Sequence, residues 1–275
     1  MKADYKNWVP LGMELGFEAA GAVLTAGALA ARKLPLSPGV RKGAGIVLGL
    51  GAAGCLACTG WCFAARRAFS YDGTRQLSRQ IVEGTAEYVT LPDGGVGLDV
   101  GCGSGALTIA CAKRNPRARM VGVDRWGPEY ASFSKARCEK NAEAEGVTNV
   151  RFRKGDACRL EFADESFDAV TSNYVYHNIS GVDKQKLLRE TLRVLKKGGT
   201  FAIHDLMEKA RYGDMEKFAA ELRAEGYEEV RLIPTANGTF MSRKEGRCYL
   251  LAGSTLLVER NSDKTALSQN SKTTK

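Results

Sequence analysis

A glycine-rich loop at residues 97–110, GLDVGCGSGALTIA, has the residue types needed to hold a ligand. An apolar run containing Asp99 leads into Gly101, Gly103 and Gly105, and a segment with helical character follows. Glycines let the backbone approach a ligand closely, and the first N–H groups of the following helix have no partner within that helix. The stretch therefore predicts a strand, a ligand-binding loop and a helix.

Two classes of cofactor fit this loop when it is taken alone. The spacing Gly101-x-Gly103-x-x-Ala106 satisfies a dinucleotide-binding fingerprint. The alternate glycines after Asp99 equally satisfy the loop that binds S-adenosylmethionine in methyltransferases. Asp124, at the end of the next apolar run, does not separate the two classes, because either cofactor presents ribose hydroxyls to a carboxylate at that point. The choice depends on the elements that follow.

Short apolar runs alternate with helical segments through the middle of the chain. This alternation predicts a parallel sheet with helices on both faces, in which ligands lie at the carboxyl ends of the strands. We expect strands at 96–100, 120–124, 150–157, 167–173 and 200–206, and helices at 73–89, 107–114, 129–146 and 184–197, the last stopped by Gly198 and Gly199.

Three later motifs favour one cofactor. Gly155-Asp156-Ala157 ends the third strand, FDAV opens the fourth, and LRVLKKGGTFAIHD joins a helix, a Gly-Gly stop and the fifth strand. With these motifs in this order from about residue 96 to 206, the chain resembles the class I S-adenosylmethionine-dependent methyltransferases. A dehydrogenase would need a second domain for its substrate, and too little chain remains to supply one.

The resemblance implies an α/β fold with a Rossmann-like seven-stranded sheet, preceded here by two hydrophobic helices. Its last two strands have candidates at 227–234 and 248–260, with a helix at 213–226 before them.

The resemblance also implies a set of residues that bind S-adenosylmethionine. Among the carboxylates, Asp99 would hold the amino-acid end, Asp124 the ribose hydroxyls and Asp156 the adenine amino group. Each has an ordinary structural alternative, since a carboxylate at the end of a strand can also cap a helix. The other implied cofactor-binding residues are Gly101, Gly103, Gly105, Arg125 or Trp126 beside the adenine, Ala157, and Asn173 at the end of the fourth strand.

Transfer of a methyl group from a sulfonium needs chiefly an aimed acceptor, because the methyl group is already a strong electrophile. A hydroxyl or acidic carbon acceptor also needs a base. The chain has two histidines, His177 and His204, and both follow strands at the expected site. These two and Tyr174 are the predicted catalytic residues, with Tyr176, Asn178 and Asp205 as neighbours. A histidine that only hydrogen-bonds a backbone carbonyl is the alternative for each.

The fourth strand ends in SNYV rather than in the Asn-Pro-Pro-Tyr type of signature found in methyltransferases of nucleic-acid bases or glutamine side chains. This weakens those acceptors and favours a small molecule, quinone or lipid. No metal site is expected. Cys55, Cys58 and Cys62 recur on one helical face, but without a nearby histidine or fourth thiol they are interpreted as packing residues. Eight scattered cysteines fit a reducing compartment.

Two apolar segments precede the predicted sheet. Residues 43–65 carry no charge and are long enough to cross a bilayer, whereas residues 9–31 include Glu14 and Glu18. We expect a membrane hairpin; a single span with an interfacial first helix and a soluble helical cap are alternatives, and a cleaved signal peptide fits poorly. Small residues four apart should let the helices approach: Gly12 and Gly16, Ala22, Ala26 and Ala30, and Gly45 and Gly49.

The formal net charge of +9 is concentrated in residues 1–70 and 261–275. The nearly balanced middle of the chain does not suit nucleic acid, whereas basic ends suit a membrane surface. We expect a membrane-anchoring hairpin at 1–67, a cytoplasmic catalytic domain at 68–260 and a basic, disordered tail at 261–275. Basic residues on both sides of the second segment leave the membrane topology open, and nothing indicates the oligomeric state.

These observations predict transfer of a methyl group from S-adenosylmethionine to a hydrophobic small molecule or lipid at a membrane. A protein or RNA methyltransferase and a catalytically silent, membrane-tethered binding protein remain alternatives.

Overall fold

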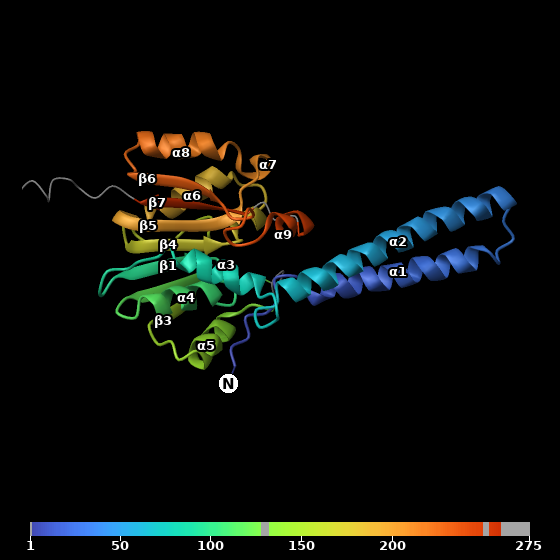
Figure 1. Cartoon of the computed structure of the whole chain (residues 1–275), viewed down its shortest axis with the longest axis horizontal. Helices are drawn as coiled ribbons and strands as arrows, with labels where there is room; N and C mark the ends of the chain where they lie inside the picture. The colour runs from blue at the N-terminus through green and yellow to red at the C-terminus, as the bar shows by residue number, and fades with distance from the viewer. Residues whose placement is uncertain (1, 128–131, 250–252, 260–275) are drawn as a thin grey trace, which may run out of the picture. The chain divides into compact units, whose positions relative to one another are not determined.

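The computed structural model describes residues 2–127, 132–249 and 253–259 (Figure 1). It divides into two compact units, one formed by Asn7–Arg79 and the other by residues 2–6 together with the chain from Gln80 onward. By these contacts the division falls after Arg79, and residues 2–6 pack with the second unit. The expected tail at 261–275 lies outside the described residues.

The first unit is a hairpin of two long helices, α1 (Leu11–Ala31) and α2 (Pro38–Ala68), seen at the blue end of Figure 1. Helix α2 begins five residues before the expected position. Ser37 caps it by accepting a hydrogen bond from the Val40 N–H, and Pro38 occupies its first turn, where the missing N–H costs nothing.

The two helices meet along a narrow seam whose less exposed residues alternate three and four apart, as in a coiled coil. A Cβ on Gly21 would lie 3.2 Å from the Cβ of Cys55, and one on Gly51 would lie 3.2 Å from Leu24. Small residues therefore do permit the close approach, but at positions other than those expected. The expected Ala22, Ala26 and Ala30 are exposed, and a Cβ on Gly12, Gly16, Gly45 or Gly49 would meet no atom within 4 Å.

The three cysteines of α2 also differ in burial. Cys62 is buried in the seam and Cys55 is half-buried, whereas Cys58 is exposed. The three thiols therefore do not share one packed face.

The second unit is built on a seven-stranded sheet of order β3-β2-β1-β4-β5-β7-β6, in which all pairings are parallel except those of β7. The order reverses between β1 and β4, and ligands of such sheets lie at this point. The strands are β1 (Val96–Val100), β2 (Arg119–Asp124), β3 (Val150–Lys154), β4 (Phe167–Asn173), β5 (Leu195–Leu206), β6 (Glu229–Pro234) and β7 (Gly253–Glu259).

Helices connect and cover these strands. Helix α4 packs on β1 and β2, α5 on β3, α6 on β5 and α8 on β6. The helices are α3 (Leu77–Ala86), α4 (Ala106–Arg114), α5 (Lys135–Ala144), α6 (Lys184–Arg193), α7 (Lys209–Tyr212), α8 (Met215–Ala224) and α9 (Arg243–Cys248), with a 3-10 turn, η2, at Tyr176–Asn178.

The predicted helix at 184–197 is too long. Helix α6 ends at Arg193, and β5 begins at Leu195, before the two glycines. Between Phe167 and Ala169 the pairing of β4 with β5 shifts from Leu195 to Thr200, so that the glycines form a bulge inside the strand. A Cβ at Gly199 would lie 2.8 Å from the carbonyl oxygen of Asp168, which explains a glycine there.

Candidate functional site

The glycine loop joins β1 to α4, as predicted. All three glycines have positive φ, 73° at Gly101, 54° at Gly103 and 85° at Gly105. A Cβ on Gly101 would also clash with the Val175 side chain, so no other residue fits unless that side chain moves. Among the described residues no side chain caps α4, which leaves its first N–H groups available to an anionic group such as the carboxylate of a cofactor.

Asp99 lies buried beneath this loop. One carboxylate oxygen accepts a hydrogen bond from Thr108 at 2.6 Å, and the other accepts one from Thr171 at 3.1 Å. Burial raises the pKa of Asp99 to about 6, although the two hydroxyl donors oppose this shift. The geometry therefore places Asp99 where it ties β1 to α4 and β4.

Asp124 ends β2 and holds the loop from the side. Its carboxylate accepts hydrogen bonds from the Gly103 N–H at 2.8 Å and the Trp126 N–H at 2.7 Å. The Trp126 indole N–H donates in turn to the Gly103 carbonyl at 2.9 Å. Asp124 is half-buried, whereas Arg125 is exposed. The predicted ribose carboxylate thus lies directly against the predicted cofactor loop.

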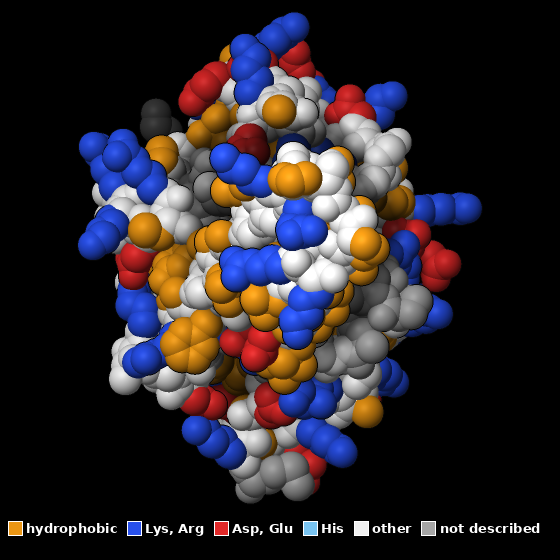
Figure 2. All heavy atoms as spheres, turned by 90° about the vertical axis from the view of Figure 1, so that its right-hand side faces the viewer, with side chains coloured by type: hydrophobic (Ala, Val, Ile, Leu, Met, Phe, Trp, Pro, Cys, Tyr) orange, Lys and Arg blue, Asp and Glu red, His pale blue; other side chains and the backbone are white. Residues whose placement is uncertain are grey.

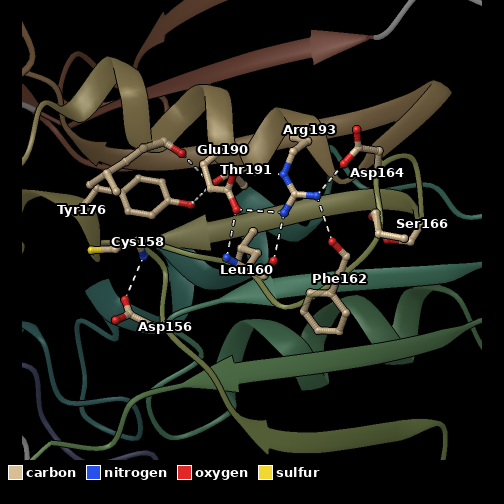
Figure 3. Close-up of polar contacts among 12 residues, drawn as sticks. Asp156, Cys158, Leu160, Phe162, Asp164, Ser166, Tyr176, Glu190, Thr191 and Arg193 are labelled. Atoms are coloured by element: carbon tan, nitrogen blue, oxygen red, sulfur yellow. Dashed lines mark hydrogen bonds and ion pairs between the residues drawn. The ribbon is translucent and has the colours of Figure 1, made fainter.

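Asp156 and Ala157 follow β3. Asp156 is exposed, and its carboxylate accepts a hydrogen bond from the Cys158 N–H at 2.8 Å (Figure 3). Ala157 is half-buried and packs against the core of the sheet. The structure thus places this pair at the carboxyl end of β3, in the same row of strand ends as Asp124.

Arg193 organises the segment after Asp156, a role that the sequence did not reveal. Its guanidinium donates to the carbonyls of Leu160 and Phe162, both at 2.9 Å, and pairs with Asp164 at 2.6 Å and Glu190 at 2.8 Å (Figure 3). The hydrogen bonds that Arg193 donates to Glu190 and Asp164 raise its pKa. A single side chain at the end of α6 therefore fixes a loop in contact with Asp156, and only the folded structure brings these groups together.

His177 lies in η2 and forms an ion pair with Asp205 through Nδ1. The buried carboxylate also accepts hydrogen bonds from the backbone N–H groups of Tyr176 at 2.8 Å and Leu206 at 2.7 Å. Burial alone would raise the pKa of Asp205, but the His177 hydrogen bond and charge outweigh it and lower this pKa. The His177 side chain remains 15% exposed. Asp205 thus holds Nδ1, and Nε2 is the ring nitrogen left for another partner.

His204 is in a different environment. It is fully buried in β5, its Nδ1 lies 2.8 Å from the Asn173 side-chain oxygen, and its Nε2 lies 2.8 Å from the Thr235 hydroxyl. Because an amide oxygen only accepts, Nδ1 carries the proton, and Nε2 accepts from Thr235. Burial lowers the pKa of His204 to about 4. Both ring nitrogens are occupied, so His204 lacks a free nitrogen for a substrate.

Tyr174 lies between the two histidines. Its ring centroid is 6.0 Å from that of His177 and 4.7 Å from that of His204, both edge-on. Its φ of 55° is unusual for a tyrosine and forms part of the turn after β4. Burial raises its pKa, which keeps the phenol neutral.

Comparisons with known proteins identify the family to which the chain belongs. Residues 92–245, more than half of the chain, match a family model described as a methyltransferase domain, and the chain belongs to this family. The matched region is therefore an S-adenosylmethionine-dependent methyltransferase domain. The fold also resembles the [4+2]-cyclase SpnF, with a TM-score of 0.51 and 21% identity over 68% of this chain and 83% of that one.

Curated relatives include small-molecule methyltransferases. The chain is 38% identical over 128 residues to an arsenite methyltransferase of Aquipseudomonas alcaligenes, covering 45% of this chain and 36% of that protein. It is 38% identical over 106 residues to a demethylmenaquinone methyltransferase of Thermus thermophilus, covering 38% and 44%. It is 30% identical over 151 residues to a 2-phytyl-1,4-naphtoquinone methyltransferase of Thermosynechococcus vestitus, covering 54% and 60%. Each match spans less than two thirds of the relative.

Within the described part of the chain, no group of three or more His, Cys, Asp or Glu residues is arranged to hold a metal ion.

Proposed function

We propose that this protein transfers a methyl group from S-adenosylmethionine to a hydrophobic small molecule or lipid at a membrane surface. The observation that carries the proposal is the hairpin, whose large apolar side chains point outward on both helices. Val23, Val47 and Leu50 are 71%, 70% and 69% exposed. Water would oppose such a surface, and hydrocarbon would favour it.

The hairpin has the dimensions of a membrane element. Both helices are long and apolar enough to cross a bilayer, and little of either is buried within the hairpin. Thr25 and Thr59 donate their hydroxyl protons to carbonyls four residues earlier, so that neither of these two hydroxyls needs a donor contact with lipid. Near the base of the hairpin, Glu14 pairs with Arg66 at 3.0 Å, so that this carboxylate is neutralised.

Exposed cations lie at the turn of the hairpin. Figure 2 is turned so that this end faces the viewer, and it shows blue side chains gathered among orange ones. Anionic lipid head groups would attract such a cluster. The exposed cations of the turn are Arg32, Lys33, Arg41 and Lys42.

The sheet unit would hold the cofactor through its loop. In this proposal the loop backbone and the uncapped end of α4 bind the amino-acid group, Asp124 the ribose and Asp156 the adenine amino group. Asp99 would act from below by keeping β1 and α4 in register. When bound, S-adenosylmethionine supplies a methyl group on a positively charged sulfur, and transfer breaks the carbon–sulfur bond with its electron pair left on sulfur.

His177 would be the base for an acceptor that must lose a proton. Asp205 holds Nδ1, which leaves Nε2 to take the proton as the new bond to the methyl group forms. Asp205 stabilises the imidazolium so formed, as the carboxylate does in a catalytic triad. His204 would act indirectly, through Asn173. Its Nδ1–H donates to the Asn173 side-chain oxygen and so fixes the orientation of the Asn173 amide N–H groups.

The relatives support the acceptor class. A demethylmenaquinone methyltransferase and a 2-phytyl-1,4-naphtoquinone methyltransferase act, by their names, on lipid-soluble quinones. An acceptor of that kind resides in the bilayer, where the proposed anchor would keep the catalytic unit.

The test is a labelling experiment. The full-length protein in lipid vesicles is incubated with S-adenosylmethionine that carries a labelled methyl group, and with either a demethylated quinone, a total lipid extract of the source cells or arsenite. We expect label in the organic phase, and much less with an Asp124→Ala control at a subsaturating concentration of the cofactor. Label on arsenite alone, or on protein or RNA added in parallel, would contradict the proposed acceptor.

A further inference from the structure

The first residues of the chain pack on the sheet unit and form a short segment, Lys2–Lys6, that we call the strap. Its Tyr5 side chain is only 5% exposed. The Asp4 carboxylate pairs with Arg137 of α5 at 2.8 Å and with Lys6 at 2.7 Å. The strap is therefore held by both packing and charge, and the chain continues from it at Asn7 into the hairpin unit.

One buried amide joins the strap to the cofactor loop. Asn141 of α5 accepts a hydrogen bond from the Asp4 N–H at 2.8 Å and donates to the Asp4 carbonyl at 3.1 Å. The same amide nitrogen donates to the carbonyl of Ser104 at 3.0 Å. Ser104 stands between Gly103 and Gly105, so that the strap and the loop meet on one side chain that is 3% exposed.

The other end of α4 carries a similar clamp. Asn115 accepts from the Leu91 N–H at 2.8 Å and donates to the carbonyls of Val89 at 3.2 Å and Cys111 at 2.9 Å. Both asparagines thus bind an incoming segment of chain to an end of the same helix. They differ in one respect, because Asn141 acts on the loop end of α4, and Asn115 on the opposite end.

We propose that Asn141, supported by the strap, is a positioning residue for S-adenosylmethionine binding. By holding the Ser104 carbonyl, Asn141 fixes the peptide between Ser104 and Gly105, whose N–H donates to the Cys102 carbonyl at 2.7 Å. Asn141 thereby keeps the loop backbone in the shape that would surround the cofactor. The strap keeps the Asn141 amide in place by filling its remaining donor and acceptor. This inference rests on the proposed assignment of the glycine loop as the cofactor site.

The experiment compares cofactor affinity with thermal stability in the full-length protein, purified in detergent. Asn141→Leu removes all three hydrogen bonds in a similar volume, and we expect the Kd for S-adenosylmethionine to rise about tenfold. Deletion of residues 2–6 leaves the Ser104 contact but removes its support, and should raise the Kd by about threefold. The two changes together should raise the Kd no more than Asn141→Leu alone, since they act through one amide.

Asn115→Leu is the matched control. It loses the same kind of contacts and should lower the melting temperature as much as Asn141→Leu does, while the Kd stays within about twofold. If Asn141→Leu does not fold, the deletion of residues 2–6 carries the test alone. An unchanged Kd in the folded Asn141→Leu protein and in the deletion, or an equal rise in Asn115→Leu, would overturn the inference. If Asp124→Ala also left the Kd unchanged, the proposed cofactor site itself would fail.

Discussion

The hairpin and the sheet unit use similar apolar residues in opposite ways. In the hairpin the outward positions carry Val47 and Leu50, about 70% exposed, and the seam carries small residues. In the sheet unit Leu98 and Val170 are completely buried, and the polar residues of the site lie at strand ends. The direction in which apolar side chains point indicates the surroundings that each unit suits. In the proposal these are lipid for the hairpin and water around the sheet unit. Substitutions in the hairpin should therefore leave the affinity for S-adenosylmethionine unaltered, and substitutions in the sheet unit should leave membrane retention unaltered.

The largest effect should come from charges on the outer surface of the hairpin. Val47→Lys together with Leu50→Lys places two ammonium groups at exposed positions in the uncharged part of α2. A lysine costs about 2.5 to 3.5 kcal/mol at the bilayer centre and less toward the interface. We expect the protein to leave the membrane pellet for the supernatant on ultracentrifugation, with its affinity for S-adenosylmethionine unchanged. Val40→Lys, beside the cations of the turn, is the control and should stay in the pellet. A soluble unsubstituted protein would refute the anchor.

Replacement of the proposed base, His177, should slow methyl transfer without changing cofactor binding or membrane retention. His177→Ala should lower turnover by about 10²-fold or more, because general-base catalysis typically contributes that much. The Kd for the cofactor and the membrane retention should not change. Asp205→Asn tests the same pair by removing the charge that stabilises the imidazolium. Full activity of His177→Ala in steady-state assays would remove this residue from the mechanism.

Replacement of the ribose carboxylate should affect cofactor binding. Asp124→Ala should raise the Kd for S-adenosylmethionine at least about tenfold, equivalent to about 1.4 kcal/mol for a lost charged hydrogen-bond pair. Titration calorimetry measures this change, and sedimentation with membranes should be unaffected. Asp93→Ala, an exposed carboxylate paired with Arg117 before β1, serves as the control.

The smallest expected effect is on the pH dependence of the free energy of unfolding, to which two buried groups contribute with opposite sign. Asp99 has a raised pKa of about 6, so the folded protein binds its proton more tightly, and Asp99 makes the free energy of unfolding fall as the pH rises from 5 to 7. His204 has a lowered pKa of about 4, so it makes this free energy rise over the same range. Each contribution is on the order of 1 to 2 kcal/mol between about pH 5 and 7.

Single substitutions should separate the two. Relative to the unsubstituted protein, Asp99→Asn should become more stable as the pH rises from about 5 to 7, and His204→Gln should become less stable. Urea unfolding at several pH values measures both slopes. Slopes of the same sign in the two variants would contradict the environments described for these residues.

Local patterns were sufficient to predict much of the sheet unit. β1 and β4 begin and end at the expected residues, because each is a short stretch with apolar and β-branched residues bounded by turn residues. The helix at 184–197 was predicted too long because Leu195, Lys196 and Lys197 also suit a helix; only pairing with β4 shows that they begin a strand. In the hairpin, glycines four apart were expected at the contact, but the register placed Gly21, Gly27 and Gly51 there.

The contacts that hold the site are separated widely in sequence. Asn141 touches Asp4 across 137 residues, and Arg193 reaches Leu160 across 33. Neither residue belongs to a motif, because an amide or guanidinium that binds backbone carbonyls gives no periodic signal. The roles of the predicted site residues remain predictions, although the structure brings their strands to one edge of the sheet.

The contact between Gly101 and Val175 has a consequence for attempts to change this enzyme's acceptor. Val175 stands next to Tyr174 and just before the turn that carries His177, and its isopropyl group occupies the space that a side chain at position 101 would need. The Val175 side chain therefore separates the glycine loop, which would hold the methyl donor, from the turn that carries His177, where the acceptor would bind. A bulkier residue at 175 would press on the donor loop, and a smaller one would loosen it, so acceptor range and donor affinity cannot be engineered independently at this position.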